Sequence, residues 1–315
     1  MRILFAAPEH AWGGILGMLR SELPEHEFEA TGRFGADTLK GYDIMMPTMC
    51  PVTREMLRES DRLRLIQQCG AGLEGVDIEA ARDMNVWVAN VPTGISGNAD
   101  SVADIGIYLM IGLSRDARAM SRSLRERRMG IPMGRALKGK TAGLVGLGGI
   151  GRALVRRLKA FDMRIIGIRR HDPRRAANEL GLDWAGGPHQ LKELLGQSDF
   201  VILCLPLVDE SRNLMNRDAF AAMKKDAFLV NLSRGGLVDR DALEEALATG
   251  KIAGAGLDVF WEEPPDPDDP VFRYNVIATP HIGGATDVSI TGIMKVVAEN
   301  IRRVERGEKP LHVKN

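Results

Sequence analysis

The sequence predicts an α/β protein with parallel sheets in two domains, and three features support this. Short apolar runs alternate with amphipathic stretches along the 315 residues, a pattern typical of strands joined by helical crossovers. The length suits two hydrophobic cores better than one. A glycine-rich turn near residue 146 lies between an apolar run and a helical pattern, as in a nucleotide-binding unit.

The expected strands are short apolar runs, and the expected helices are amphipathic or apolar segments between them. The strands are predicted at residues 2–6, 44–46, 65–69, 87–89, 142–146, 164–168, 200–205, 228–232, 254–258 and 276–278. Helices are predicted at residues 99–115, 151–160, 191–196, 218–223, 239–249 and 286–306. The turn-rich segment near residues 92–98 indicates a domain boundary. The basic stretch at 122–130 is interpreted as a solvated helix face or an exposed connection.

Composition argues against several classes of partner. Lys plus Arg equals Asp plus Glu at 42 each, so no global field favours nucleic acid or an anionic membrane. The low aromatic content, 5%, argues against base-stacking platforms. No apolar run has the length of a membrane-spanning helix, and the first residues do not resemble a signal peptide.

The cysteines Cys50, Cys69 and Cys204 have neither CxxC nor zinc-finger spacing, so the sequence predicts no metal site. Cys69 and Cys204 lie in apolar runs, where a buried free thiol is usual. Unpaired cysteines imply a reducing compartment. We therefore expect a cytoplasmic protein.

The pattern G-x-G-x-x-G falls on Gly146, Gly148 and Gly151, after an apolar strand and at the start of a helical pattern. The first glycine permits the tight turn, the second lets a pyrophosphate approach, and the third lets helix and strand pack closely. Gly149 and Ile150 are the expected amide donors to the phosphates. The turn predicts a dinucleotide site.

The residues that follow the next strand bear on the choice of cofactor. About 20 residues beyond the glycine turn, an acidic residue would bind the adenine-ribose hydroxyl. This chain has Arg169 and Arg170 there, and arginine pairs with phosphate in bidentate fashion. NADP(H) is therefore favoured. In the alternative, Arg169 covers the adenine and Asp172 binds the ribose, which leaves NAD(H) open.

Four motifs resemble the D-isomer-specific 2-hydroxyacid dehydrogenases, in the family's order and spacing: GAGLEGVD at 70–77, NLSRGGLVD at 231–239, AGLDVFWEEP at 255–264 and TPHIGG at 279–284. The resemblance implies two Rossmann- or flavodoxin-like domains with the site in the cleft between them. Residues 1–97 and 287–315 would form a discontinuous substrate domain, and residues 98–286 the dinucleotide-binding domain. It also implies a homodimer, for which we expect the apolar segment 99–113 to be the contact.

Carried over position by position, the resemblance implies Arg234 as the substrate-binding arginine, Glu263 as its acidic partner residue and His281 as the acid/base. The guanidinium fork suits the carboxylate and keto oxygen of a 2-keto acid. A carboxylate beside an imidazole stabilises the imidazolium. The remaining implied contacts are with the cofactor, at Leu205, Pro206, Ser233, Asp258 and Gly283, and with the substrate carboxylate, at Ala71 and Gly72.

The implied activity is hydride transfer between NADP(H) or NAD(H) and a small 2-keto acid or D-2-hydroxy acid, as in glyoxylate/hydroxypyruvate reductases. Glu263 differs from the glutamine of the related formate dehydrogenases, and Pro47 stands where 3-phosphoglycerate dehydrogenases place an arginine. Met46, Met49 and Trp261 would form an apolar pocket wall, although core filling is an equally good interpretation of the methionines. Two alternatives stay open: a phosphite dehydrogenase-like enzyme, and a nicotinamide-sensing regulator resembling corepressors.

Overall fold

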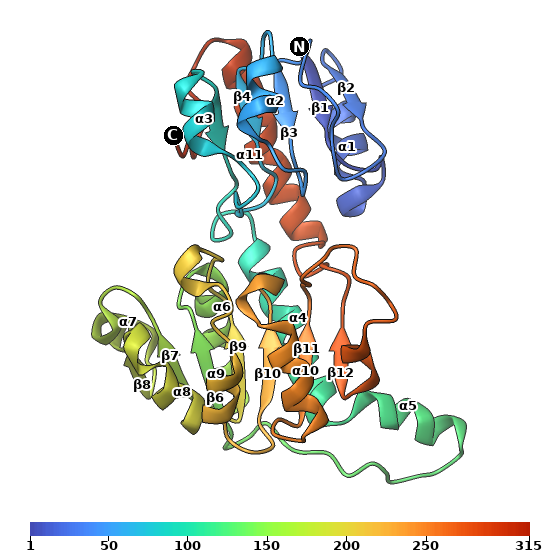
Figure 1. Cartoon of the computed structure of the whole chain (residues 1–315), viewed down its shortest axis with the longest axis vertical. Helices are drawn as coiled ribbons and strands as arrows, with labels where there is room; N and C mark the ends of the chain where they lie inside the picture. The colour runs from blue at the N-terminus through green and yellow to red at the C-terminus, as the bar shows by residue number, and fades with distance from the viewer. The chain divides into compact units, whose positions relative to one another are not determined.

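The computed structural model describes all 315 residues and divides into two compact units. Unit 1 comprises Met1–Asn98 and Gly284–Asn315, and unit 2 comprises Ala99–Gly283 (Figure 1). Each unit is built on one sheet in which every strand pairing is parallel. The predicted α/β fold class with two parallel-sheet domains is confirmed.

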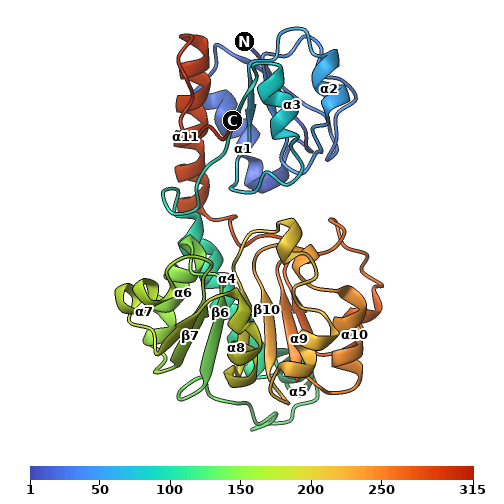
Figure 2. The same ribbon diagram turned by 60° about the vertical axis from the view of Figure 1, so that its left-hand side comes forward.

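Unit 1 has a five-stranded sheet in the order β2-β1-β3-β4-β5, the order of flavodoxin-like folds. Its strands are β1 (Arg2–Phe5), β2 (Glu27–Ala30), β3 (Ile44–Met46), β4 (Leu65–Gln67) and β5 (Trp87–Ala89). Its helices are α1 (Ala11–Glu22), α2 (Arg54–Glu59), α3 (Ile78–Asp83) and α11 (Asp287–Glu305). Apolar residues of α1 and α11 share one core layer, and those of α2 and α3 share another. Figure 2 shows α11 running beside α1.

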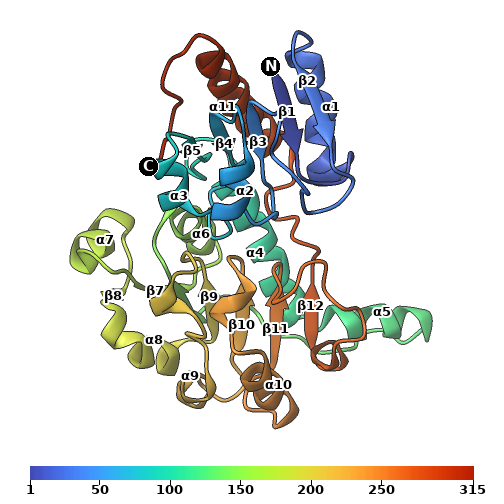
Figure 3. The same cartoon turned by 45° about the horizontal axis from the view of Figure 1, so that its top comes forward.

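Unit 2 has a seven-stranded sheet in the order β12-β11-β10-β9-β6-β7-β8, which is the Rossmann order extended by one strand. Its strands are β6 (Thr141–Val145), β7 (Arg164–Ile168), β8 (Trp184–Gly186), β9 (Phe200–Leu203), β10 (Phe228–Asn231), β11 (Gly254–Leu257) and β12 (Val276–Ala278). Its helices are α4 (Asn98–Ser114), α5 (Ala117–Arg125), α6 (Gly149–Lys159), α7 (Pro173–Leu180), α8 (Leu191–Gln197), α9 (Arg217–Ala222) and α10 (Arg240–Ala248). Apolar residues of α8, α9 and α10 pack into one core layer, and those of α4 and α6 into the other (Figure 3).

Two strands were missed from the sequence, and both are short edge strands. In β2, which reads EFEA, only Phe28 is buried, so the strand carries almost no apolar signal. In β8, Trp184 and Ala185 are only half-buried. An edge strand has a neighbour on one side only and tolerates polar, solvated residues. Hydropathy alone therefore cannot detect these strands. No helix in the structure combines the length and the apolar character needed to cross a membrane.

Candidate active site

Within unit 2, most of the predicted site residues follow the carboxyl ends of strands. Because all seven strands are parallel, these ends lie along one edge of the sheet, and ligands bind there in open α/β folds. Ordered by strand, they are Gly146–Gly151 after β6, Arg169 and Arg170 after β7, Leu205 and Pro206 after β9, Ser233 and Arg234 after β10, Asp258 after β11, and His281 and Gly283 after β12.

The glycine turn has the geometry that a pyrophosphate needs. Gly146 has φ +109°, and a Cβ there would lie 2.5 Å from the carbonyl oxygen of Cys204. A Cβ on Gly151 would lie 2.4 Å from the carbonyl oxygen of Gly146, whereas a Cβ on Gly148 would meet nothing within 4 Å. Gly148 is also the N-cap of α6 and provides no side-chain acceptor to its first amides. The turn is thus tightly packed at Gly146 and Gly151 and open at Gly148, where a phosphate group fits.

Arg169 and Arg170 follow β7, at the strand end next to the glycine turn. The Arg169 backbone N–H donates to the Gly186 carbonyl at 3.0 Å. The Arg170 side chain is exposed and lies 3.7 Å from Glu210. Asp172, the alternative ribose ligand, accepts from the Arg175 backbone N–H at 3.3 Å as the N-cap of α7. One oxygen of that carboxylate therefore already has a donor within its own helix.

Glu263 and His281 form a hydrogen-bonded pair. His281 Nδ1 lies 2.7 Å from Glu263 Oε2. The other carboxylate oxygen, Oε1, accepts from the backbone N–H of Phe260 at 2.9 Å, which fixes the carboxylate in its loop. A carboxylate is only an acceptor, so it keeps a proton on Nδ1 and leaves Nε2 to exchange the second one.

Glu263 is held in its charged form. Burial raises the pKa of the Glu263 carboxyl. Four effects lower this pKa by more than burial raises it: the hydrogen bond from His281, the charge of His281, the Phe260 N–H and the charge of Arg234. The net pKa lies below the ordinary value of a glutamic acid. The carboxylate is therefore ionised at neutral pH beside the imidazole, where it favours the imidazolium.

Asp258 holds the segment that carries His281. Its Oδ1 accepts from the Thr279 hydroxyl at 2.6 Å and from the Ile282 N–H at 3.0 Å, and its Oδ2 accepts from the Gly283 N–H at 2.9 Å. Between these anchors His281 has φ +52°, a conformation that is unfavourable for a side chain of this size. Burial raises the pKa of Asp258 despite the three donors. The bonds around His281 thus hold a strained backbone in place.

Arg234 is positioned by its own strand end and by a close backbone approach. The buried Asn231 side chain donates to the Arg234 carbonyl at 2.8 Å and accepts from the Ser233 N–H at 3.1 Å. A Cβ on Gly235 would lie 2.0 Å from the carbonyl oxygen of Phe260, so only glycine fits there. This contact brings the Arg234 turn against the loop that begins with Phe260 and contains Glu263.

In unit 1, the predicted substrate contacts differ in exposure. Ala71 is exposed and Gly72 half-buried, and the structure gives neither backbone N–H an acceptor. Met49 is half-buried, whereas Met46 is fully buried in the core with Ile3 and Phe5. Core filling is therefore the role that the structure assigns to Met46. In unit 2, the half-buried Trp261 donates through Nε1 to the Val238 carbonyl at 2.6 Å.

Asn231 and Thr279 also support the site but were not predicted from the sequence. Both are polar residues at the ends of apolar strands, and both bond to a predicted site residue or to its backbone. A polar residue at the carboxyl end of a buried parallel strand is the signal that could have identified them.

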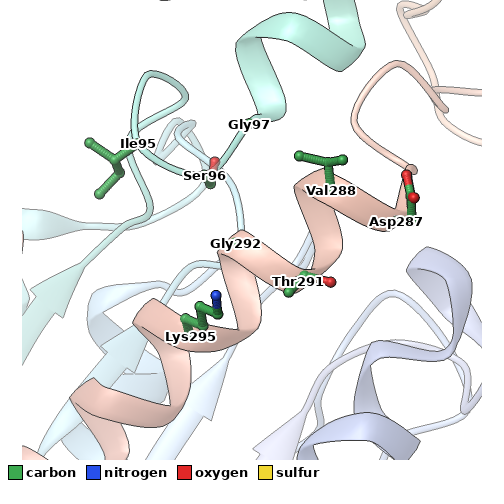
Figure 4. A pocket seen from close by; sticks show the side chains of 8 residues that line it. All are labelled: Ile95, Ser96, Gly97, Asp287, Val288, Thr291, Gly292 and Lys295. Carbon is green, nitrogen blue, oxygen red and sulfur yellow. The ribbon is translucent and has the colours of Figure 1, made fainter.

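A hollow in unit 1 contains none of the predicted site residues. It measures about 530 Å³ and is lined by Ile95, Ser96, Gly97, Asp287, Val288, Thr291, Gly292 and Lys295 (Figure 4). A Cβ on Gly292 would lie 2.2 Å from the Ser96 carbonyl, and one on Gly97 would lie 2.6 Å from Val288. The hollow thus flanks a tight crossing of α11 and the 95–97 segment, both in unit 1.

Comparison with known proteins gives a consistent likeness. The family model described as D-isomer specific 2-hydroxyacid dehydrogenase, NAD binding domain, matches residues 107–283. The chain is 36% identical over 319 residues to glyoxylate reductase of Korarchaeum cryptofilum, covering 98% of this chain and 93% of that protein. It is 39% identical over 271 residues to D-3-phosphoglycerate dehydrogenase of Methanocaldococcus jannaschii, covering 84% of this chain but only 50% of that longer protein.

Among solved structures, the TT0316 protein from Thermus thermophilus superposes with a TM-score of 0.85 at 31% sequence identity, and the match covers the whole of both chains. The likeness therefore extends over both units of the chain as well as over the nucleotide-binding motif.

Proposed function

The chain belongs to the D-isomer specific 2-hydroxyacid dehydrogenase family of NAD(P)-dependent enzymes, as its motifs predicted, and on that premise we propose that it reduces small 2-keto acids to D-2-hydroxy acids. The observation that carries the proposal is the hydrogen-bonded pair of His281 and Glu263, 2.7 Å apart, at the carboxyl edge of the unit 2 sheet. A proton donor held beside a half-buried carboxylate can supply the proton that reduction of a carbonyl requires.

Each proposed site residue has a distinct role in the reduction. When bound at the glycine turn, the nicotinamide cofactor supplies the hydride. Arg234 binds the substrate carboxylate and polarises the keto oxygen, and His281 donates the Nε2 proton to the developing alkoxide. Glu263 stabilises the imidazolium before transfer. Asp258 positions His281 and, as the family resemblance implies, contacts the nicotinamide. The unbonded amides of Ala71 and Gly72 suit a carboxylate.

The substrate is proposed to be small and unphosphorylated, with glyoxylate and hydroxypyruvate as the first candidates. The full-length likeness to a glyoxylate reductase supports this choice. Pro47, in place of an arginine, supports it from the sequence. The test is oxidation of NADPH and NADH with a panel of 2-keto acids, with 3-phosphoglycerate and phosphite tested in the reverse direction. Turnover of phosphite or 3-phosphoglycerate alone would replace the proposal, and no turnover with any substrate would favour a regulator.

We propose NADP(H) as the preferred cofactor, because Arg169 and Arg170 follow β7 and Asp172 caps its own helix. Replacing Arg169 by Asp is expected to lower the NADPH/NADH ratio of kcat/KM by about 10-fold or more, since a hydrogen bond to a charged group contributes roughly 1.5–3 kcal/mol. Steady-state kinetics with both cofactors measure the ratio. Arg164→Asp, at the other end of the same strand, is the control. A wild-type enzyme that already prefers NADH would contradict the assignment.

We also propose a homodimer, with a contact that combines the outer face of the segment expected from the sequence with the residues that follow it. The apolar residues of α4 mostly face inward, and Val102, Leu109, Met110 and Leu113 are buried in the core of unit 2. The inner face of segment 99–113 is therefore already covered, and only its outer face is available for the contact expected from the sequence. Seven exposed large apolar residues lie on the outer face of α4, on α5 and just beyond: Tyr108, Ile111, Met120, Leu124, Met129, Ile131 and Met133. Figures 1 and 3 show α5 projecting to the side of unit 2.

Seven exposed large apolar side chains within residues 108–133 indicate an interaction site. Sedimentation at micromolar concentration is expected to give a dimer for the wild type and a monomer for Leu124→Asp/Met133→Asp, whose side chains are 77% and 95% exposed. Met18→Asp, an exposed methionine of α1, is the matched control and should stay dimeric. A monomeric wild type would remove the proposal.

We propose a reducing compartment from the state of the three cysteines. Cys50, Cys69 and Cys204 are free and buried, and burial raises the pKa of Cys69 and of Cys204 to about 12. These inert thiols suit a reducing compartment such as the cytoplasm.

A further inference from the structure

A histidine outside the proposed active site has an unsatisfied, buried nitrogen. His26 lies in unit 1 between α1 and β2, and its side chain is only 1% exposed. Its Nε2 is buried without any hydrogen-bond partner. An unpaired buried polar group is costly, and natural proteins rarely leave one without a partner or a ligand. The buried, unpartnered Nε2 therefore indicates a bound group at this position.

Two carboxylates converge on this nitrogen. Glu25 Oε1 and Glu305 Oε2 each lie 3.9 Å from His26 Nε2, and the three candidate ligand atoms lie within 4.8 Å of one another. Neither glutamate forms an ion pair with any lysine or arginine. The nearby arginines of α11 pair with other acids, Arg302 with Glu22 and Arg306 with Glu299 and Glu308. Two acidic groups thus face one imidazole, and no arginine or lysine compensates their charge.

The backbone fixes this arrangement from two distant parts of the sequence. Glu25 and His26 end the turn that follows α1, where the His26 N–H donates to the Leu23 carbonyl at 3.1 Å. Glu305 is the last residue of α11, the helix that packs against α1 (Figure 2). The carboxylates are 52% and 49% exposed, so a cation could reach them from solvent.

We propose that Glu25, His26 and Glu305 form a zinc site. One imidazole nitrogen and two carboxylate oxygens are a donor set that Zn²⁺ accepts, with water completing the tetrahedron. Ligands of tetrahedral zinc at about 2.0–2.1 Å lie roughly 3.4 Å apart. Each carboxylate oxygen, now 3.9 Å from Nε2, must therefore come about half an ångström nearer to it, and the two carboxylate oxygens must approach each other by up to about 1.4 Å. Glutamates that are half exposed can make that movement by rotating their side chains.

Coordination through Nε2 also assigns the imidazole proton. That proton must sit on Nδ1, which lies 3.4 Å from the Met1 nitrogen. The Met1 ammonium is also a donor, so this long contact must open when zinc binds. Bound zinc would join the start of β2 to the end of α11 and so stabilise unit 1.

The test compares zinc binding to the metal-free full-length protein and to two charge-matched variants. In Glu25→Gln/Glu305→Gln two of the three ligands lose their charge. In Glu27→Gln/Glu299→Gln two other glutamates of unit 1 lose theirs, one exposed and one half-buried. Isothermal titration with ZnCl₂ is expected to show a site in the wild type and in the Glu27/Glu299 variant. Its affinity should fall by at least about 10-fold in the Glu25/Glu305 variant, because even outer-shell partners of a ligand contribute about 10- to 100-fold.

A second measurement separates this site from zinc that binds elsewhere, including at His281. Zinc should raise the Tm of the wild type and of the Glu27/Glu299 variant, and EDTA should reverse the rise, whereas the Glu25/Glu305 variant should not respond. Equal titrations and equal Tm shifts in all three proteins, or no binding to the wild type, would overturn the proposal. These readouts do not depend on the dehydrogenase activity.

Discussion

Replacing His281 by alanine is expected to lower kcat for 2-keto acid reduction by about 10²- to 10⁴-fold, the usual contribution of a general acid. The imidazole is bonded through Nδ1 to Glu263, and Nε2 is the nitrogen that can deliver a proton. Cofactor affinity, measured by the fluorescence of bound NADPH, should be retained, since the glycine turn follows a different strand. Steady-state kinetics at saturating keto acid measure the loss of kcat.

The matched control for this prediction is His189→Ala, which removes an exposed imidazole elsewhere in unit 2. It should keep wild-type kcat. An enzyme that keeps full activity with alanine at position 281 would refute the assignment of His281 as the proton donor, whatever the control shows.

Replacing Glu263 by glutamine is expected to move the alkaline limb of the pH–rate profile for reduction to lower pH. The pKa of Glu263 lies below its ordinary value, so the wild-type carboxylate is charged throughout the working range and favours the protonated imidazole. Glutamine keeps the size and a hydrogen bond but removes that charge. Without that charge the protonated imidazole loses its partner, so activity should fall first at alkaline pH and least at acid pH.

The measurement is kcat/KM for the keto acid between about pH 5 and 10, a window that brackets the titration of histidine. Glu262→Gln is the matched control, since Glu262 is the exposed neighbour of Glu263, and its profile should equal that of the wild type. If the Glu263→Gln profile is unchanged as well, the carboxylate does not act on the acid/base group and only shapes the loop.

The sequence alone determined the features that are encoded by contiguous residues. The central strands can be predicted from hydropathy because each is buried on both faces and forms an apolar run, as β6 and β9 do. The glycine turn is equally local, since Gly146 and Gly151 are required by contacts within one strand–turn–helix unit and by the adjacent strand. The motifs around Arg234, Glu263 and His281 indicated the family because their residue types and spacing recur together.

Other features depended on residues that are distant in sequence, and only the tertiary structure decided them. The edge strands β2 and β8 form because a neighbouring strand offers hydrogen bonds, which hydropathy does not record. The inner face of α4 is covered by the core of unit 2, so the exposed apolar residues of this region lie on the outer face of α4, on α5 and beyond. Glu305 reaches Glu25 and His26 only through the packing of α11 on α1. Spacing patterns report local geometry, whereas these contacts form when the chain folds back on itself.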